Sequence, residues 1–406
     1  FGEGYDNLDK RSQVHVENVR YLTENHGGPI TVIAELCGRA GMDFFPSVRM
    51  NEHYDMDESS HSYSRLRREH PEYLIGRGKD IVGPSLEWGI RTGLDYAIPE
   101  VRRYMASIIV ELLSRFDVDG IELDYMRHPA FFRIEEAYAN RYFMTDFIAY
   151  IRQQIDTIGK QKGKNLDLIV RVPPTLGDCT RIGLDVATWI AEELIDIVVV
   201  GGFIPFEMPM HEFVETASQT DVHILGCLEA LRPTVDELTM RAVASRYWQQ
   251  GVAGLYLFNY YNMSQNWKRD VLSKLINTAD LARLDKRYEF DQRGKVRPNS
   301  QLGFSFQNAI PSTQLPTALE TTIIGPSTQL ILNIADDLEQ AKAQDTLGEC
   351  TISLRLQNMG DKDQIEVCLN DKTLPVTNAR QSTGGWTRNV YGGGAHGYPS
   401  QIKTDT

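Results

Sequence analysis

The chain has 406 residues, 42% hydrophobic and 24% charged, which is enough for two domains or for one large barrel with an appendage. The net charge is −13 without a basic block, which argues against nucleic-acid binding, and no stretch approaches the ~20 apolar residues of a membrane helix. We therefore expect a soluble protein that binds neither nucleic acid nor membranes. It starts at Phe1 without a signal-peptide pattern, so it is either cytoplasmic or exported with its leader outside this sequence.

The five cysteines are odd in number and far apart, with neither redox nor zinc spacing; they are Cys37, Cys179, Cys227, Cys350 and Cys368. This pattern predicts reduced, buried thiols rather than disulfides. The sequence implies no cofactor, and it leaves the oligomeric state open.

The first part of the chain predicts few elements. Residues 1–29 are polar and predict none, whereas residues 29–40 carry apolar residues at helical spacing and end at Gly41. Residues 42–50 predict a strand, and residues 88–96 predict a second one. The polar stretch between them predicts a long loop, a feature that is more often functional than idle.

From Pro99 onward, helices and strands alternate with short links. One expected helix starts at Pro99, and further helices are expected at 135–158, 185–193, 209–217, 234–249 and 266–276. Expected strands span 118–125, 166–172, 195–200, 222–228 and 252–258. This alternation predicts a parallel sheet covered by helices.

The seven expected strands predict a (β/α)8 TIM barrel over residues 1–284. The first strand of the barrel would be missing, either hidden within residues 1–20 or upstream of Phe1. A doubly wound open sheet is the alternative, but no glycine-rich phosphate fingerprint follows any strand.

After residue 284, short alternating runs replace the helical periodicity. They lie at 329–333, 351–356 and 364–369, and the last turns at Asn370-Asp371. We expect residues 285–406 to form a smaller all-β, β-sandwich-like accessory domain that is incomplete.

Two acids interrupt the apolar strand at 118–125. Side chains alternate along a strand, so Glu122 and Asp124 share one face. Carboxylates near the C-terminal end of a buried parallel strand are costly unless they are paired or used. Glu229 ends the strand at 222 and would face them across the barrel mouth.

Cleavage of a glycosidic bond needs two such carboxylates, one protonated and one ionised. We predict Asp124 and Glu229 as this catalytic pair. Glu122 lies about 6–7 Å deeper along its strand, where an ion pair with Arg49 or Arg171 would make it structural. For Glu229 the alternative is that it simply begins a surface loop.

Other polar residues at the same ends of the strands would bind the substrate. They are Arg49, Asn51, His53, Asp95, Glu122, Arg127, Arg171, Asn259 and Tyr260. The arginines favour an acidic or sulfated sugar, unless Glu122 and Asp95 occupy them. Structural alternatives remain open: solvated histidines at 53 and 128, and rim packing at Tyr260.

The motif DGIELDYMRHP at residues 119–129 resembles the DGIxLDYxRxP strand of bacterial glycosyl-hydrolase-like family-ten barrels. Residues 45–53 resemble the second-strand motif of that family, residues 94–102 its third-strand junction, and residues 254–260 its eighth strand. The resemblance covers about residues 28–280. It implies a carbohydrate-active (β/α)8 hydrolase with Asp124 in its site and an accessory β-sandwich.

The sequence therefore predicts a glycoside hydrolase that acts on an oligo- or polysaccharide. A non-catalytic glycan-binding barrel is the alternative, and the two differ in whether the two acids share one cleft. A metal-dependent hydrolase using His53, Asp55 and Asp124 is a third possibility, although nothing in the spacing defines a ligand set.

Overall fold

The computed structural model describes most of the N-terminal two thirds of the chain and shorter pieces of the rest. The described residues are 10–51, 58, 63–76, 91–126, 129–201, 208–229, 237–260, 265–290, 314–315, 317, 319, 327–354, 356, 364–375, 388–391 and 399–402. The chain divides into two compact units, the first comprising residues 1–335 with 391–398 and the second residues 336–390 with 399–406.

Two helices open the chain. α1 (Lys10–His26) and α2 (Pro29–Ala40) contact each other, and Gly27 and Gly28 between them have φ of 74° and 106°. The prediction of α2 is confirmed. The sequence indicates no clear element within residues 1–29, where the structure has α1, so the missing first strand is not at residues 10–20. α1 escaped detection because it has no buried apolar stripe, and Val14 and Tyr21 are 50% and 60% exposed.

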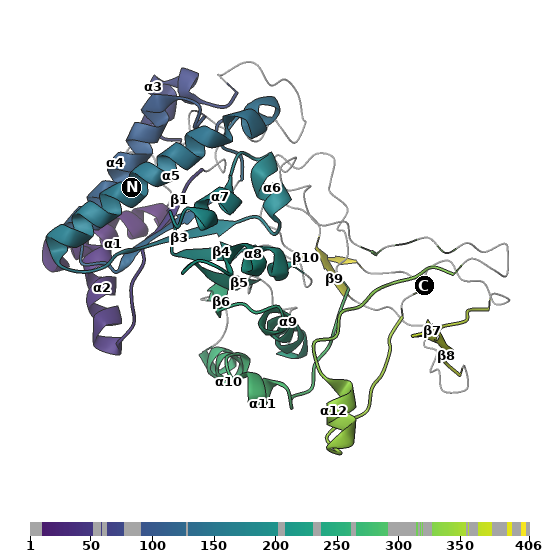
Figure 1. Cartoon of the computed structure of the whole chain (residues 1–406). Helices are drawn as coiled ribbons and strands as arrows, with labels where there is room; N and C mark the ends of the chain where they lie inside the picture. The colour runs from purple at the N-terminus through teal and green to yellow at the C-terminus, as the bar shows by residue number, and fades with distance from the viewer. Residues whose placement is uncertain are drawn as a thin grey trace. The chain divides into compact units, whose positions relative to one another are not determined.

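Six strands of the described residues form one parallel sheet in sequential order (Figure 1). They are β1 (Ser47–Arg49), β2 (Gly120–Asp124), β3 (Asp167–Val172), β4 (Ile197–Val200), β5 (His223–Glu229) and β6 (Gly254–Phe258). The expected parallel sheet is confirmed, and the strands lie within a few residues of their predicted positions.

The strand predicted at 88–96 does not lie between β1 and β2, because these two strands pair directly. Residues 88–90 lie outside the described residues, and residues 91–96 form turns with one bridge between Leu74 and Leu94. Backbone hydrogen bonds hold this segment as a loop: Ile75 N donates to Gly93 O at 2.8 Å, and Tyr96 N donates to Phe131 O at 2.8 Å.

The sheet is curled into a half-barrel. Tyr256 on β6 donates a hydrogen bond to Glu122 on β2 over 3.3 Å, although these strands are four places apart in the sheet. In a flat sheet, four steps of ~4.8 Å would separate them by roughly 19 Å. Arg171 on β3 and the Phe258 ring on β6 also meet, with 3.8 Å from Cζ to the ring centroid.

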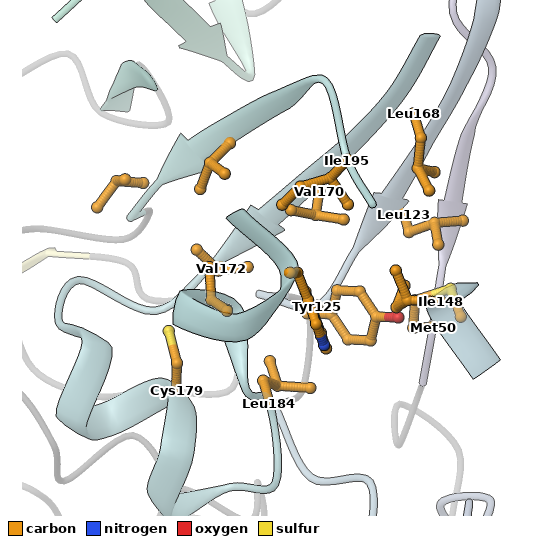
Figure 2. Packing of buried hydrophobic residues seen from close by; sticks show 14 of the residues in the cluster. Met50, Leu123, Tyr125, Ile148, Leu168, Val170, Val172, Cys179, Leu184 and Ile195 are labelled. Carbon is orange, nitrogen blue, oxygen red and sulfur yellow. The ribbon is translucent and has the colours of Figure 1, made fainter. Parts of the chain in front are cut away.

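The outer face of the half-barrel carries the main hydrophobic core. Helices α4 (Pro99–Arg115), α5 (Ile134–Lys162), α8 (Met210–Ala217) and α9 (Glu237–Gln249) contact β2, β3 and β5. Figure 2 shows Leu123, Leu168 and Val170 of the strands gathered with Ile148 of α5. The remaining helical elements of the first unit are α3 (Arg65–Glu69), η2 (Pro71–Tyr73), α6 (Leu176–Arg181), α7 (Val186–Ala191), α10 (Gln265–Leu275) and α11 (Thr278–Leu281).

Beyond residue 284 the chain stays in contact with α9. Arg241 donates to the Asp285 carbonyl over 3.1 Å, and the buried Arg246 donates to the carbonyls of Asn333 and Glu289 over 2.8 and 3.2 Å. The predicted boundary at residue 284 stays a prediction.

The second unit has little regular structure among its described residues. Its elements are α12 (Leu338–Ala343), the hairpin of β7 (Cys368–Leu369) and β8 (Lys372–Thr373), and the strands β9 (Arg388–Tyr391) and β10 (Pro399–Ile402). Tyr391, the last residue of β9, belongs to the first unit. The predicted turn at Asn370-Asp371 is confirmed, with both residues at positive φ.

Strands expected at 329–333 and 351–356 are not found among the residues described there. Ile331 is 70% exposed, and Ile352 and Leu354 are each 52% exposed. Because the alternating side chains have no buried face to pack on, the pattern alone does not specify strand pairing.

All five cysteines are free, as predicted. The expectation of burial holds for Cys179 and Cys227 and is wrong for Cys350 and Cys368, which are exposed. Among the described helices, none combines the length and the apolar character needed to cross a membrane.

Gly120 allows β2 and β3 to approach each other closely. A Cβ atom at this position would lie 2.1 Å from the Asp167 carbonyl oxygen. We expect Gly120→Ala to lower the free energy of unfolding by about 1–3 kcal/mol, because the backbone of β3 has to move. Denaturant titration measures the change. Gly38→Ala in α2 is the matched control: no atom lies within 4 Å of its Cβ, and it should stabilise by about 0.5–1 kcal/mol. Equal effects of the two variants would contradict this account.

Candidate functional site

Three charged residues lie in one row across β1, β2 and β3. Arg49, Asp124 and Arg171 are direct register partners in the parallel ladder. Arg171 Nε and Nη2 donate to Asp124 Oδ1 and Oδ2, both over 2.9 Å. The Met126 backbone N–H also donates to Oδ1, over 2.9 Å. Asp124 is thus held in a fixed orientation at the C-terminal end of β2.

The Asp124–Arg171 pair is buried, with side chains 4% and 0% exposed. Burial by itself would lower the pKa of Arg171, but the Asp124 charge outweighs it and raises this pKa. The Phe258 ring covers the guanidinium. Arg171 Nη1 has no hydrogen-bond partner among the described residues. Two parallel charge-assisted hydrogen bonds of this kind are stronger and more directional than bonds between neutral groups.

Glu122 lies one step deeper on the same face and has a different environment. Ser47 Oγ donates to its Oε1 over 2.5 Å, and the Tyr256 hydroxyl donates to the same oxygen over 3.3 Å. Glu122 is 4% exposed. Burial raises its pKa, and the nearby Asp124 charge adds to this, while the Ser47 hydrogen bond and Arg171 oppose it.

The sequence-based interpretation of these two acids needs a correction. Glu122 was expected to pair with Arg49 or Arg171, but Arg171 forms its ion pair with Asp124. The register of β2 and β3 is the reason, since it sets Arg171 opposite Asp124 and the apolar Ile169 opposite Glu122.

Apolar side chains surround the charged row. Ile169, Val199 and Cys227 form a second hydrophobic cluster inside the half-barrel, with partly buried Tyr256 and Phe258 against it. This low-polarity setting strengthens electrostatic interactions. One ion-paired carboxylate and one carboxyl with a raised pKa on a single strand face are typical of acid–base sites.

Asn51 and Asp95 are buried in the loops beside the half-barrel. The Asn51 side chain donates to the carbonyls of Leu94 and Ala130 over 2.9 and 2.7 Å and accepts from Leu94 N over 2.9 Å. Asp95 Oδ1 accepts from Ala97 N over 2.9 Å and caps the turn before α4. These contacts give both residues a role in fixing the loops.

Asn259 and Tyr260 follow β6 directly. Asn259 has φ of 61°, which turns the chain out of the strand. Tyr260 is 7% exposed, belongs to the outer core, and its hydroxyl lies 3.6 Å from Met240 Sδ. The rim-packing alternative describes Tyr260 better than sugar stacking does, because its ring is buried.

Three further predicted site residues lie wholly or partly outside the described residues. His53 and Arg127 are outside, and of Glu229 only the backbone is described. Glu229 is the last residue of β5 and the register partner of Phe258, whose ring covers Arg171. The backbone of Glu229 thus pairs with the residue whose side chain contacts the partner of Asp124.

The sequence analysis missed Ser47, Tyr256 and Phe258. Strand alternation contained the signal: Ser47 has the parity of Arg49, and Tyr256 and Phe258 share the face opposite Leu255 and Leu257. Within the described part of the chain, no group of three or more His, Cys, Asp or Glu residues is arranged to hold a metal ion. The metal-dependent alternative rests on His53 and Asp55, which lie outside that part.

No protein-family model and no curated protein sequence matches the chain. Among solved structures, a chitinase from Chromobacterium violaceum ATCC 12472 has 13% identity and a TM-score of 0.37, and the match covers 62% of this chain and 86% of that one. The PgaB (BpsB) glycoside hydrolase domain from Bordetella bronchiseptica has 14% identity and a TM-score of 0.37, with 58% and 77% covered.

The maltogenic alpha-amylase AmyB from Thermotoga neapolitana has 16% identity and a TM-score of 0.34, with 56% of this chain covered. This chain spans only 48% of that amylase. These structural neighbours are glycoside hydrolases, but TM-scores this low carry no argument about the fold or activity of this chain.

The buried ion pair leads to a stability prediction. We expect Arg171→Met to lower the free energy of unfolding by about 3–5 kcal/mol, because it leaves Asp124 buried without its cation. Adding Asp124→Leu to this variant should restore most of the loss, since no buried charge remains. Arg115→Met, which removes an exposed pair with Glu111, is the control and should cost roughly 0–1 kcal/mol. Thermal or denaturant unfolding measures all three, and a double variant as unstable as Arg171→Met alone would refute the account.

Proposed function

We propose that this protein is a glycoside hydrolase that cleaves glycosidic bonds of an oligo- or polysaccharide at the C-terminal mouth of the half-barrel. The observation that carries the proposal is the buried, oriented carboxylate of Asp124 at the end of a parallel strand. A stabilising core does not need an ion pair there, since apolar residues of similar volume serve as well. The C-terminal ends of parallel strands are where barrel enzymes place their catalytic groups.

Asp124 would be the ionised carboxylate, acting as nucleophile or general base. Glu229 is our candidate for the acid. The support for Glu229 is its position on the backbone: it is the register partner of Phe258, and Phe258 contacts the arginine that binds Asp124. From β5, Glu229 would act across the mouth of the half-barrel from Asp124 on β2.

In this scheme the acid gives its proton to the glycosidic oxygen while the bond from that oxygen to the sugar breaks. With a carboxyl separation of ~5–5.5 Å, Asp124 would form a bond to the sugar carbon, and water would later hydrolyse it with retention. With ~6.5–9.5 Å, Asp124 would instead take a proton from a water that attacks directly, with inversion.

The remaining parts of the sequence-based reading belong to the same proposal. The half-barrel would be part of a closed (β/α)8 barrel, and residues 285–406 would form a β-sandwich-like accessory domain, for which the β7–β8 hairpin is the present support. Arg49 is exposed at the end of β1, level with Asp124, and would favour an acidic or sulfated sugar.

A non-catalytic glycan-binding protein is the second candidate, and one observation favours it. Both Asp124 oxygens already accept hydrogen bonds, and the residue is only 3% exposed. A nucleophile needs a free oxygen lone pair that the substrate can reach. In this alternative, Asp124 would hold Arg171 in place and the rim residues would bind sugar.

The proposal predicts that Asp124→Asn abolishes hydrolysis, because an amide cannot act as nucleophile or base. Glu229→Gln should lower kcat by roughly 10²–10⁴-fold, the usual contribution of a general acid. The measurement is a screen against a panel of complex polysaccharides, with released products identified by mass. Asp117→Asn is the control, since this acid is 90% exposed beyond the opposite end of β2 and should leave turnover unchanged.

Thermal unfolding of each variant separates loss of chemistry from loss of fold. Near-normal turnover by Asp124→Asn would refute the hydrolase assignment. Sugar binding that survives both substitutions, with no hydrolysis by the wild type, would establish the glycan-binding alternative.

A further inference from the structure

Glu122 is the point where three strands of the half-barrel meet. Ser47 of β1 and Tyr256 of β6 both donate to its Oε1, and it is itself on β2. β1 and β6 are the two edges of the described sheet. No hydrogen bond or ion pair joins Glu122 to a cation among the described residues, although it is 4% exposed. Both of its donors are neutral hydroxyl groups.

The charged and titratable groups facing Glu122 come from the strands around it. Asp124 is on its own strand, Arg171 on β3 and Tyr256 on β6. Cys227 on β5 interacts in turn with Arg171 and Tyr256. Arg49 of β1, the register partner of Asp124, is a second cation at this end of the strands. Arg171 is the cation whose charge acts on Glu122, and Asp124 already takes two of its donors.

We propose that Glu122 is a positioning residue that works as a neutral carboxyl: it leaves Asp124 as the single negative charge bound to Arg171, and its ionisation turns the site off. The catalytic part of this inference rests on the proposed hydrolase function, whereas the neutral state of Glu122 does not.

The physical reason is competition for Arg171. An ionised Glu122 would add a second negative charge two residues from Asp124, on the same strand face and in an apolar cluster. Arg171 Nη1 has no partner among the described residues and could then donate to Glu122. The guanidinium would be shared between two acids, and Asp124 would lose the orientation that its two parallel hydrogen bonds give it.

The direction of the pH effect follows from the raised pKa of Glu122. In the folded protein Glu122 keeps its proton to a higher pH than in the unfolded chain, so stability falls as pH rises through the raised value. Activity falls in the same pH range, because the same ionisation disturbs Asp124. Glutamine retains the acceptor oxygen for Ser47 and Tyr256 but cannot ionise. Glu122→Gln should therefore remove both the loss of stability and the loss of activity at rising pH.

The first test is stability, which needs no substrate. Melting temperatures of wild type and Glu122→Gln are compared from pH 4 to pH 9. We expect the variant to become progressively more stable than the wild type as pH rises. Glu111→Gln, at an acid 58% exposed on α4, is the matched control and should show no such divergence. Ser47→Ala removes a hydrogen bond that lowers the pKa of Glu122, so the loss of stability seen in the wild type at rising pH should extend to higher pH in this variant.

The second test is the pH profile of kcat/KM on a polysaccharide that the wild type cleaves. We expect that kcat/KM of Glu122→Gln no longer falls at alkaline pH, and that in Ser47→Ala the fall occurs at higher pH than in the wild type. At acidic pH, Glu122→Gln should change kcat less than ten-fold. A merely structural role would lower activity equally at every pH.

The outcomes separate this inference from the proposed function. If the melting temperatures of wild type and Glu122→Gln change with pH in the same way, the inference that Glu122 is neutral is overturned. If kcat/KM of Glu122→Gln still falls at alkaline pH, the inference that ionisation of Glu122 turns the site off is overturned. In both cases, hydrolysis by the wild type would leave the proposed function intact. Complete loss of hydrolysis in a folded Glu122→Gln variant would make Glu122 a catalytic acid and overturn the positioning role. If the wild type cleaves nothing, the proposed function fails and the switch fails with it.

Discussion

The ion pair between Asp124 and Arg171 is the interaction on which the interior of the half-barrel depends. It joins adjacent strands, draws the Phe258 ring from β6 onto its guanidinium, and fixes Asp124 at the end of β2. Removing two charges from water is expensive, and an apolar pair of similar volume often serves stability as well or better. The pair is therefore better explained by a task for an oriented charge than by stability, and this makes Asp124 the centre of the proposed site.

Two acids on one strand face have opposite surroundings. Asp124 faces a guanidinium that supplies two donors, whereas Glu122 faces two hydroxyl groups inside an apolar cluster. A cation favours the ionised form of a carboxyl, and burial without one favours the neutral form. Adjacent acids that both ionise would repel each other, so this division of environments lets the strand carry both in the interior.

Sequence reasoning predicted the parts of this site that depend on local periodicity. Strand alternation placed Glu122 and Asp124 on one face, and the strand–helix alternation predicted the parallel sheet. It failed where register decides: the choice between Ile169 and Arg171 as the residue opposite Glu122 is a pairing between distant segments. Alternation gives the face on which Tyr256 lies, but only the curl of the sheet brings β6 across to β2 and Tyr256 to Glu122. The strands predicted at 329–333 and 351–356 were not found, because alternation indicates a strand only where one face of it is buried.

The curl also determines how the catalytic hypothesis for Glu229 has to be argued. Along the direct register, Asp124 is level with Arg171, Val199, Leu225 and Gly254, four residues short of Phe258 on β6. Yet Phe258 contacts Arg171, so levels across the interior are offset by about one residue per strand, as the strand tilt of a barrel requires. Register alone would set Glu229 about four residues above Asp124, and the proposed pairing of the two acids relies on this stagger to lower it. A two-carboxylate mechanism on this sheet thus depends on strand tilt as much as on the identity of the acids.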